Sequence, residues 1–538
     1  MKNHLSQMGR PAGLLIGALL ALGAWPPAAS AAQSLQVGGG LVSDVAADPT
    51  GVRVFKGIPY ANPPVADLRW KAPRPVKAWE GVRAAGDWGP RCVQTSRLGP
   101  LDPLNKRMDE DCLYLNVFTP AKPGDAPLPV MVWIHGGSNT NGAASQPEYD
   151  GTALARKGVI VVSINYRLDI FGFLAHPELT AESGTGSSGN YGLLDQIAAL
   201  EWVQDNIAVF GGNAKNVTLF GESAGAFNVS LLMSSPLAKG RFARVIAESG
   251  GAFSRQPGFG PKPLRAGEAD GVKFMQNAGA ASVADLRAKP AQELMDALAK
   301  GPIVYGLGVI DGYVVPEHPA AVFAAGKQND VPLLNGWNTD EGSLFTARMN
   351  PPGTPQAYAE LLGRQFKDQT SKVTALYAPG ETPQEVKAAF TALFGDELIA
   401  YGTWAWAEAA ARKGKSAVYR YYFTRRPPGA PEFSIYPLAA PGVFHFAEIA
   451  YVFNNFDVRK DWNWQAADRD LGELMSSYWT NFARNGDPNG ANLPRWEAYK
   501  PGGGGKVMEL GAASRLRDEP RRDRFELFET LFNPASDK

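Results

Sequence analysis

The chain has 538 residues, of which 45% are hydrophobic and 20% charged, a composition typical of a soluble globular protein. Its 53 basic side chains are balanced by 53 acidic ones, and no basic block stands out. Such a chain has no strong field to draw it to nucleic acid or anionic lipid, so we expect neither as a partner.

The N-terminus has the pattern of a targeting signal. Lys2 and Arg10 are followed by an apolar run over residues 13–25 and by the small residues Ala29-Ser30-Ala31. This pattern predicts a signal peptide over residues 1–31 and export to the periplasm or the exterior. A retained membrane anchor is the alternative, but the apolar run is too short to span a bilayer comfortably. We expect residues 32–538 to form a single domain.

The only two cysteines, Cys92 and Cys112, lie in the part of the chain predicted to be exported. An even number of cysteines in an oxidising compartment predicts one disulfide, which we expect to pin a loop. Two buried free thiols are the alternative. The Cys-x₂-Cys spacing of a zinc site is absent from the sequence, and no metal is implied.

Short β-branched runs alternate with longer segments along the chain, which predicts an α/β fold with a large, mostly parallel sheet flanked by helices. Helices are predicted over residues 193–209 and 224–233. The last predicted helix places Phe525, Phe528 and Phe532 on one face, which we interpret as core packing. The predicted strands cover residues 130–134, 159–164, 217–220, 244–247, 331–334 and 418–423.

A glycine-rich loop, His135-Gly136-Gly137-Ser138, follows the first of these strands. Glycines let a backbone approach a substrate carbonyl closely, so that its N–H groups can stabilise an oxyanion. The alternative is a plain glycine turn. A nucleophile motif further along the chain favours the oxyanion interpretation.

That motif is Gly221-Glu222-Ser223-Ala224-Gly225, which fits the Gly-x-Ser-x-Gly nucleophile elbow. A bare match has a real false-positive risk. Here a β-branched strand precedes the motif and a helix-forming run follows it, as the elbow requires. The sequence therefore predicts Ser223 as a nucleophile, with the amide of Ala224 as an oxyanion donor.

A carboxylate should orient the base of such a serine, and the chain order in this fold places it between the serine and the histidine. Asp340 and Glu341 are adjacent and follow a predicted strand. The residues alone do not separate the two. One is expected to point at the histidine and the other away from it.

The base is found by elimination among five histidines. His4 lies in the predicted signal peptide, His135 in the glycine loop, and His176 and His318 each precede a proline. His445 occurs late in the chain and after a strand, where this fold places its base. It is therefore the predicted partner of Ser223.

With these motifs in view, the sequence resembles the type-B carboxylesterases, the family that includes the cholinesterases, over nearly the whole mature chain. The serine elbow with Phe210-Gly211-Gly212 before it resembles the family's serine signature, and the segment Glu110-Asp111-Cys112-Leu113-Tyr114-Leu115-Asn116-Val117 resembles its second signature. The segments Phe55-Lys56-Gly57-Ile58-Pro59-Tyr60-Ala61, Leu68-Arg69, Asn190-Tyr191-Gly192-Leu193-Leu194-Asp195-Gln196 and Phe482-Ala483-Arg484-Asn485-Gly486-Asp487-Pro488-Asn489 resemble further motifs of the family.

The resemblance implies an α/β-hydrolase fold and specific roles. The acid maps to Glu341, the histidine to His445, the oxyanion donors to Gly137, Ser138 and Ala224, and the first disulfide to Cys92–Cys112. Ser138 replaces a glycine found in many members, which puts the width of the oxyanion hole in question. The resemblance also implies an ion pair between Arg69 and Glu110.

These features predict a serine carboxylic-ester hydrolase that forms an acyl-enzyme on Ser223, acts on a small-molecule ester and needs no cofactor. Residues 93–111 contain no aromatic side chain, so the tryptophan that binds choline in cholinesterases is missing and we do not expect a choline esterase. Glu222 is expected either to add negative potential or to be a buried structural acid.

Two alternatives stay open: a binding protein on the same scaffold, or a hydrolase that prefers thioester, amide or carbamate bonds. The pocket walls are expected from residues 250–311, from the region of Trp404 and Trp406, and from the loop before His445. Aromatic side chains in these regions either line an acyl pocket or pack in the core, and core packing is the commoner outcome. The sequence leaves the natural substrate and the oligomeric state open.

Overall fold

The protein is described here from a computed structural model, which defines residues 34–94, 107–122, 124–256, 258–301, 306–347, 349–428, 442–460, 462–502 and 504–532. From Ser34 onward these residues belong to one compact unit. The predicted signal peptide, residues 95–106 within the disulfide loop and most of the loop before His445 lie outside the described residues.

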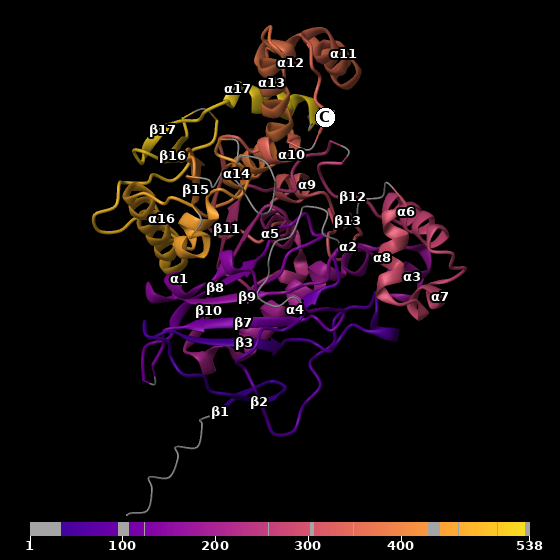
Figure 1. Cartoon of the computed structure of the whole chain (residues 1–538), viewed down its shortest axis with the longest axis vertical. Coiled ribbons are helices and arrows are strands. Elements are labelled where there is room, and N and C mark those ends of the chain that lie inside the picture. The colour runs from indigo at the N-terminus through magenta and orange to yellow at the C-terminus, as the bar shows by residue number, and fades with distance from the viewer. Residues whose placement is uncertain are drawn as a thin grey trace, which may run out of the picture. The chain divides into compact units, whose positions relative to one another are not determined.

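A ten-stranded sheet runs through the described part of the chain, in the order β17-β16-β15-β14-β11-β10-β8-β9-β7-β3 (Figure 1). The strands from β16 to β9 in this order pair in parallel, whereas β7, β3 and β17 join antiparallel to their neighbours. The strands are β3 (Arg53–Pro59), β7 (Tyr114–Thr119), β8 (Leu128–Ile134), β9 (Ile160–Ile164), β10 (Gly212–Glu222), β11 (Arg244–Glu248), β14 (Leu333–Asn338), β15 (Val418–Phe423), β16 (Lys506–Leu510) and β17 (Arg515–Asp518).

The central strands are apolar on both faces because helices cover both. In β8, Val130, Val132 and Ile134 pack into the core layer that contains α4, α5, α14 and α17. Met131 and Trp133 alternate with them and pack into the opposite layer, which contains α1, α15 and α16. The two-residue repeat of a strand thus produces two cores, one on each side of the sheet.

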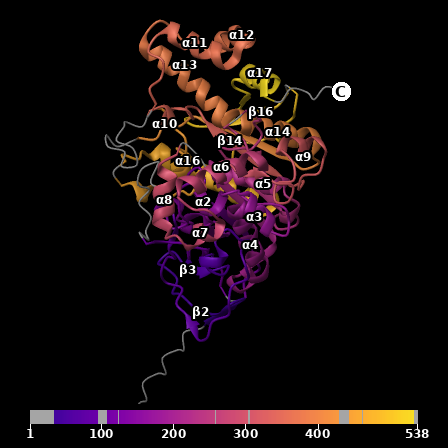
Figure 2. The same ribbon diagram turned by 90° about the vertical axis from the view of Figure 1, so that its right-hand side faces the viewer.

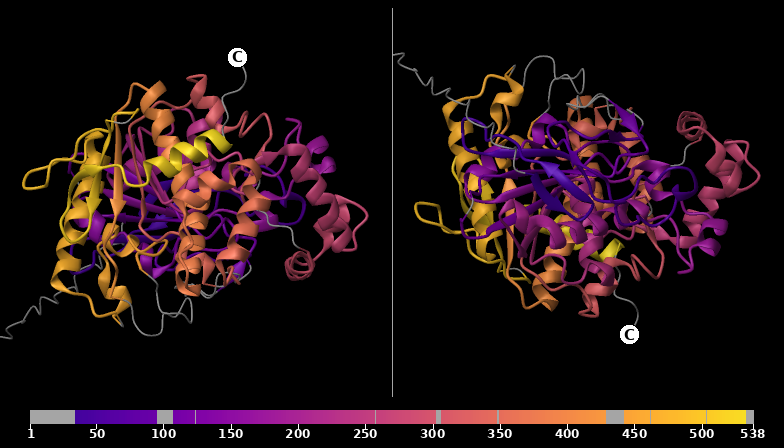
Figure 3. Two further views of the ribbon diagram at one scale, coloured as in Figure 1. Left: turned by 90° about the horizontal axis from the view of Figure 1, so that it is seen from above. Right: turned by 90° about the horizontal axis from the view of Figure 1, so that it is seen from below.

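Helices project from the loops at several points. The group α6 to α8 lies to one side of the sheet, and α11 to α13 lie together at one end, beyond α10 (Figures 1, 2 and 3). The helices are α1 (Thr152–Arg156), α2 (Asp169–Phe173), α3 (Pro177–Glu182), α4 (Tyr191–Asn206), α5 (Ala224–Ser234), α6 (Leu264–Asn277), α7 (Val283–Ala288), α8 (Ala291–Ala299), α9 (Pro319–Ala324), α10 (Ser343–Thr346), α11 (Pro355–Phe366), α12 (Thr370–Leu376), α13 (Pro383–Gly395), α14 (Tyr401–Lys413), α15 (Ile449–Val452), α16 (Ala466–Asn485) and α17 (Arg522–Phe532).

Small pairings complete the described secondary structure. One three-stranded sheet has the order β1-β2-β4, and two pairs are β5 with β6 and β12 with β13. Their strands are β1 (Ser34–Val37), β2 (Gly40–Ser43), β4 (Val82–Arg83), β5 (Arg91–Cys92), β6 (Met108–Asp109), β12 (Lys262–Pro263) and β13 (Val309–Ile310).

The expected α/β architecture is confirmed, and each predicted strand has its counterpart. Two strands differ most in their bounds: β10 covers Gly212–Glu222 instead of residues 217–220. Strand β14 begins at Leu333 and continues to Asn338, where residues 331–334 were predicted. The part of β14 beyond the prediction carries Asn335 and Asn338, which are buried and hydrogen-bonded to neighbouring segments. Because strands were predicted from runs of apolar residues, these asparagines led to a predicted strand that ended too early.

The N-terminal third contains two cross-links that the sequence predicts. Cys92 and Cys112 form the expected disulfide. Arg69 pairs with Glu110 through two hydrogen bonds of 2.6 and 2.7 Å, and its guanidinium also donates to the carbonyl oxygens of Leu286, Arg287 and Lys289. The ion pair therefore fastens this region to α7 and the residues after it.

None of the helices in the described part of the chain combines the length and the apolar character that a membrane crossing requires.

Candidate active site

Ser223 lies at the tight turn between β10 and α5, with φ 55° and ψ −121°. L residues rarely adopt this conformation, so the serine is held under local strain. Its amide donates to the carbonyl oxygen of Glu248 on the neighbouring strand β11 at 2.8 Å. Its own carbonyl accepts from the amide of Phe227, which closes the first turn of α5. The turn thus presents the hydroxyl above the edge of the sheet.

The glycines of this motif are required by close contacts. A Cβ on Gly225 would lie 2.0 Å from the carbonyl oxygen of Ile134, and one on Gly221 would lie 2.7 Å from the same oxygen. Gly250, after β11, is as constrained, because its Cβ would lie 2.4 Å from the carbonyl oxygen of Ser223. Helix α5 can therefore approach β8 only when these side chains are absent.

Glu341 and His445 meet directly. One carboxylate oxygen of Glu341 lies 2.6 Å from Nδ1 of His445, and the other accepts the amide of Asn338 at 2.7 Å. Asp340 points elsewhere, since its carboxylate accepts the amide of Val443 at 2.7 Å. Of the two adjacent acids that the residues alone could not separate, the structure thus brings Glu341 to the imidazole.

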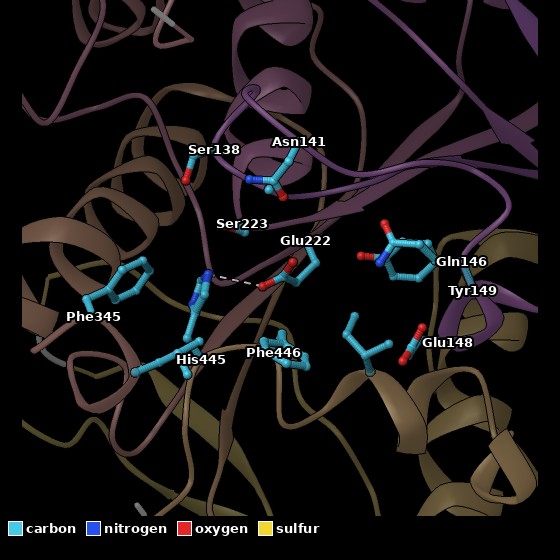
Figure 4. Close-up of a pocket in the computed structure, with 13 residues that line it drawn as sticks. Ser138, Asn141, Gln146, Glu148, Tyr149, Glu222, Ser223, Phe345, His445 and Phe446 are labelled. Atoms are coloured by element: carbon cyan, nitrogen blue, oxygen red, sulfur yellow. Dashed lines mark ion pairs between the residues drawn. The ribbon is translucent and has the colours of Figure 1, made fainter. Parts of the chain in front are cut away.

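The other nitrogen of His445 faces the pocket that Ser223 lines (Figure 4). This nitrogen, Nε2, makes no hydrogen bond and lies 3.2 Å from Oε1 of Glu222. Phe345 packs against the ring at a centroid distance of 5.0 Å. The imidazole is therefore anchored by Glu341 through Nδ1, while Nε2 lies beside Glu222 in the pocket that Ser223 lines.

Burial and charge shift the pKa values of the two groups in contact. Burial alone would lower the pKa of His445, but the carboxylates of Glu222 and Glu341 attract the protonated ring and raise its pKa to about 9. Burial raises the pKa of Glu222 to about 8, although the nearby His445 acts in the opposite direction. Since 3.2 Å separates them, the two groups titrate as a pair.

Further acids, which the sequence patterns did not indicate, surround this pair. Glu448 accepts hydrogen bonds from Asn338 and Ser249, and Glu248 accepts one from Trp479. Burial raises the pKa of Glu448 to about 7 and that of Glu248 well above its usual range. The position of Glu448 three residues after His445, in the same short segment, is the signal that could have identified it.

The glycine-rich loop after β8 supplies backbone groups to the same pocket. Gly137, with φ 102°, and Ser138, with φ 57°, both line it beside Ser223, and Ala224 begins α5 directly after the serine. The amides of these three residues donate no hydrogen bond to any described residue. They are thus available to a substrate oxygen.

The remaining described histidines have structural surroundings. His135 is buried, stacks on Tyr166, and has its pKa lowered to about 4 by burial. His176 and His318 each accept a backbone amide at the start of a short helix, α3 and α9. Both histidines are therefore N-caps, each followed by a proline at the first position of its helix.

The expected pocket walls are partly wrong. Trp404 and Trp406 pack in the hydrophobic core and do not line this pocket, and no described residue of 250–311 lines it. Its described walls come instead from the segment after the glycine loop and from α10 and α15: Asn141, Gln146, Glu148, Tyr149, Leu344, Phe345, Phe446 and Ile449. The polar part of this wall was not predicted, because no motif or periodicity in the sequence marks these residues.

Among the residues that the structure describes, the His, Cys, Asp and Glu side chains form no group of three or more that could hold a metal ion.

Comparisons with known proteins agree on one family. The model of the Carboxylesterase family matches residues 35–528. A fumonisin B1 esterase of Sphingopyxis macrogoltabida is 37% identical, over 86% of this chain and 84% of its own length. A para-nitrobenzyl esterase of Bacillus subtilis is 36% identical, over 84% of this chain and 89% of its own.

A solved structure gives the same result. The crystal structure of a Geobacillus stearothermophilus carboxylesterase superimposes with a TM-score of 0.77 at 32% identity, covering 92% of this chain and 99% of that one. Sequence, fold and family model thus agree over most of the chain. The protein therefore belongs to the carboxylesterase family and is a carboxylesterase with the α/β-hydrolase fold.

Proposed function

We propose that this carboxylesterase hydrolyses small-molecule esters through an acyl-enzyme on Ser223, with His445 as general base and Glu341 as the group that orients it. The observation that carries the proposal is the position of His445. Its Nδ1 is bound to a buried carboxylate, and its unbonded Nε2 faces the pocket of the strained serine.

In the first half of the reaction, Nε2 takes the proton of the Ser223 hydroxyl as its oxygen attacks the ester carbonyl. Nε2 has to turn from Glu222 toward the hydroxyl, and catalytic hydrogen bonds of this kind are often long before substrate binds. The carbonyl oxygen gains negative charge, which the free amides of Gly137, Ser138 and Ala224 stabilise. The imidazolium then protonates the leaving alcohol.

In the second half, a water molecule gives its proton to Nε2 and attacks the acyl carbon. The tetrahedral intermediate collapses, the acid leaves, and the proton returns to the serine oxygen. Glu341 holds one tautomer of His445 throughout and stabilises the imidazolium by charge. Because only backbone amides stabilise the oxyanion, Ser138 serves in place of glycine as long as its amide keeps this direction.

The test is hydrolysis of p-nitrophenyl butyrate by the wild-type protein and by Ser223→Ala. We expect Ser223→Ala to lose at least about 10⁴-fold in kcat, because no other group supplies the nucleophile. A fluorophosphonate should label the wild type once, and peptide mapping should find the adduct on Ser223. Full activity in Ser223→Ala would refute the mechanism.

The alternatives separate in two measurements. A binding protein on this scaffold would fold but neither turn over the ester nor take the label. A hydrolase that prefers another bond would cleave a butyryl anilide or thioester faster than the matched butyrate ester.

We also propose that residues 1–31 are a signal peptide and that residues 32–538 are the exported single-domain protein. The disulfide between Cys92 and Cys112 supports this proposal, because disulfides persist mainly in oxidising compartments. Expression of the full chain in a Gram-negative host, followed by mass measurement of the periplasmic product, should give a mature N-terminus at Ala32. An unprocessed product would contradict it.

A further inference from the structure

The proposed oxyanion donors come from two separate elements, which have to be held in register. The amides of Gly137 and Ser138 belong to the loop after β8, whereas the amide of Ala224 begins α5. One oxyanion can accept from all three only if each N–H reaches it at about 2.7–3.1 Å. The loop has no regular structure to ensure this, since Ser138 and Asn139 have positive φ values of 57° and 54°. Tertiary contacts therefore have to hold it in place.

A pair of buried asparagines joins the two elements. The side chain of Asn139 donates through Nδ2 to Oδ1 of Asn228 at 2.9 Å, and its Oδ1 accepts from Nδ2 of Asn228 at 2.8 Å. Asn139 is 1% exposed and Asn228 is 0% exposed. Two reciprocal hydrogen bonds fix both the separation and the relative orientation of two planar amides, so the pair is a rigid link.

The other contacts of Asn139 determine which way its amide faces. Nδ2 also donates to the carbonyl oxygen of Gly306, and Oδ1 accepts from the hydroxyl of Tyr166 at 2.9 Å. A carbonyl oxygen only accepts, so the nitrogen faces Gly306 and the oxygen is left to face Tyr166. Asn228 meets both of these atoms, and the orientation of its own amide is thereby fixed as well.

The place of each asparagine in the chain connects the pair to the reaction centre. Asn228 lies one turn after Ala224 on α5, so the two residues share a face of the helix. Asn139 directly follows Ser138 in the loop. Each member of the pair is thus next to a proposed oxyanion donor, and the pair spans the two halves of the oxyanion hole.

The backbone bonds of the loop do not replace this link. The carbonyl oxygen of Gly137 accepts two amides from the same loop, and that of Asn139 accepts the amide of Asp169, at the start of α2, at 2.7 Å. These bonds hold the loop together and against α2, but none of them reaches α5. The bonds to Asn228 are the ones that join the loop to the helix of the nucleophile.

We propose that Asn139 and Asn228 are positioning residues that hold the oxyanion hole in its reactive geometry. The inference rests on the proposed function and adds the contact that sets the direction of its amides. Neither side chain lines the pocket, so both act through the neighbouring Ser138 and Ala224. The oxyanion exists only in the transition state, so loosening the pair should lower kcat and leave KM nearly unchanged.

The test replaces Asn228 by leucine, which is similar in size and forms no hydrogen bond. With p-nitrophenyl butyrate, Asn228→Leu should lower kcat by about 10- to 100-fold, because a misplacement of about 1 Å costs up to about 10²-fold. Asn206→Leu is the matched control, since Asn206 is a buried asparagine that binds backbone groups of Gly38 and Trp202. It should lower the melting temperature and leave kcat within about twofold of wild type.

A transition-state analogue separates positioning from general damage. The ketone 1,1,1-trifluorohexan-2-one can add to a reactive serine, and its carbonyl oxygen then becomes an oxyanion. The alcohol 1,1,1-trifluorohexan-2-ol has a similar shape and cannot add. In Asn228→Leu the inhibition constant of the ketone should rise by the factor by which kcat/KM falls, while that of the alcohol stays unchanged. An unchanged constant for the ketone, or an equal rise for both compounds, would overturn the inference.

Asn228→Ser, whose side chain is one atom shorter, covers the case in which the leucine variant does not fold, and the same losses are expected. An unchanged kcat in a folded variant of Asn228, or a loss that Asn206→Leu shares, would overturn the inference while the proposed function stands. Absence of Ser223-dependent hydrolysis by the wild type would instead overturn the proposed function, and the inference with it.

Discussion

Replacing Glu222 by glutamine isolates the charge beside the proposed base. Its Oε1 lies 3.2 Å from Nε2 of His445. Two unit charges at this distance interact by about 5 kcal/mol at an effective dielectric constant of about 20, and by about 1.3 kcal/mol in water. At about 1.4 kcal/mol per pKa unit, Glu222→Gln should lower the pKa of His445 by about 1 to 4 units.

The direction of the kinetic effect follows from the role of the imidazole. A general base acts in its neutral form, so the acid limb of kcat/KM against pH reports the pKa of His445 in the free enzyme. With a pKa of about 9 in the wild type, this limb should lie above pH 7. In Glu222→Gln it should move to lower pH.

The assay is kcat/KM for p-nitrophenyl butyrate between about pH 5 and pH 10, read at the isosbestic wavelength of the nitrophenol. Glu248→Gln is the matched control. Glu248 pairs in register with Glu222 on the next strand, but its carboxylate accepts a hydrogen bond from the indole of Trp479 instead of lying against the imidazole. An acid limb that stays in place in Glu222→Gln, moves to higher pH, or moves equally in Glu248→Gln would refute the reasoning.

Three further predictions concern stability. Gly225→Ala places a Cβ 2.0 Å from the carbonyl oxygen of Ile134 and should lower the free energy of unfolding by several kcal/mol. Gly363→Ala, in α11, places a Cβ with nothing within 4 Å and should raise the free energy of unfolding by up to about 1 kcal/mol. Equal melting temperatures of the two variants in differential scanning calorimetry would contradict this prediction. Arg69→Met leaves Glu110 without its partner and should cost about 3–5 kcal/mol in urea unfolding, a loss that an unchanged midpoint would disprove. Burial raises the pKa of Glu397 from 4.5 to about 7, so between these values the folded state binds more protons than the unfolded state and stability falls as pH rises. Glu397→Gln removes this loss, so its melting temperature relative to wild type should be higher at pH 8 than at pH 5, and the reverse order would rule the explanation out.

The sequence predicts the sheet and the position of the elbow well because both follow from short-range rules. The run before Ser223 is β-branched, and the glycines around it are dictated by contacts with Ile134 that any such elbow makes. The prediction of the disulfide likewise needs only a count of two cysteines. These features require no knowledge of which distant segments meet.

The choice between Asp340 and Glu341 shows where such rules stop. Both residues follow β14, and only the contact of Asp340 with Val443 and of Glu341 with His445 separates them. These contacts join segments about 100 residues apart. The resemblance to a family assigned the acid to Glu341, but the residues alone could not.

The pocket walls were predicted least well. The region of Trp404 and Trp406 was expected to contribute because it follows the family pattern least clearly, but both side chains are in the core, the commoner place for large aromatic residues. The polar wall around Glu148 lies on an irregular segment, whose course depends on tertiary contacts such as that with Asn455. No periodicity in the sequence encodes such a wall.

The order of strands in the sheet has a consequence for how the protein is made. From β10 onward, β11, β14, β15 and β16 are added side by side in the order in which the ribosome delivers them. The strand that carries Ser223 is in place early, the acid loop arrives later, and His445 comes only after β15. A growing chain therefore carries its proposed nucleophile without the proposed base from residue 223 until residue 445 of its 538 has been added, so we expect reactivity to begin only late in assembly.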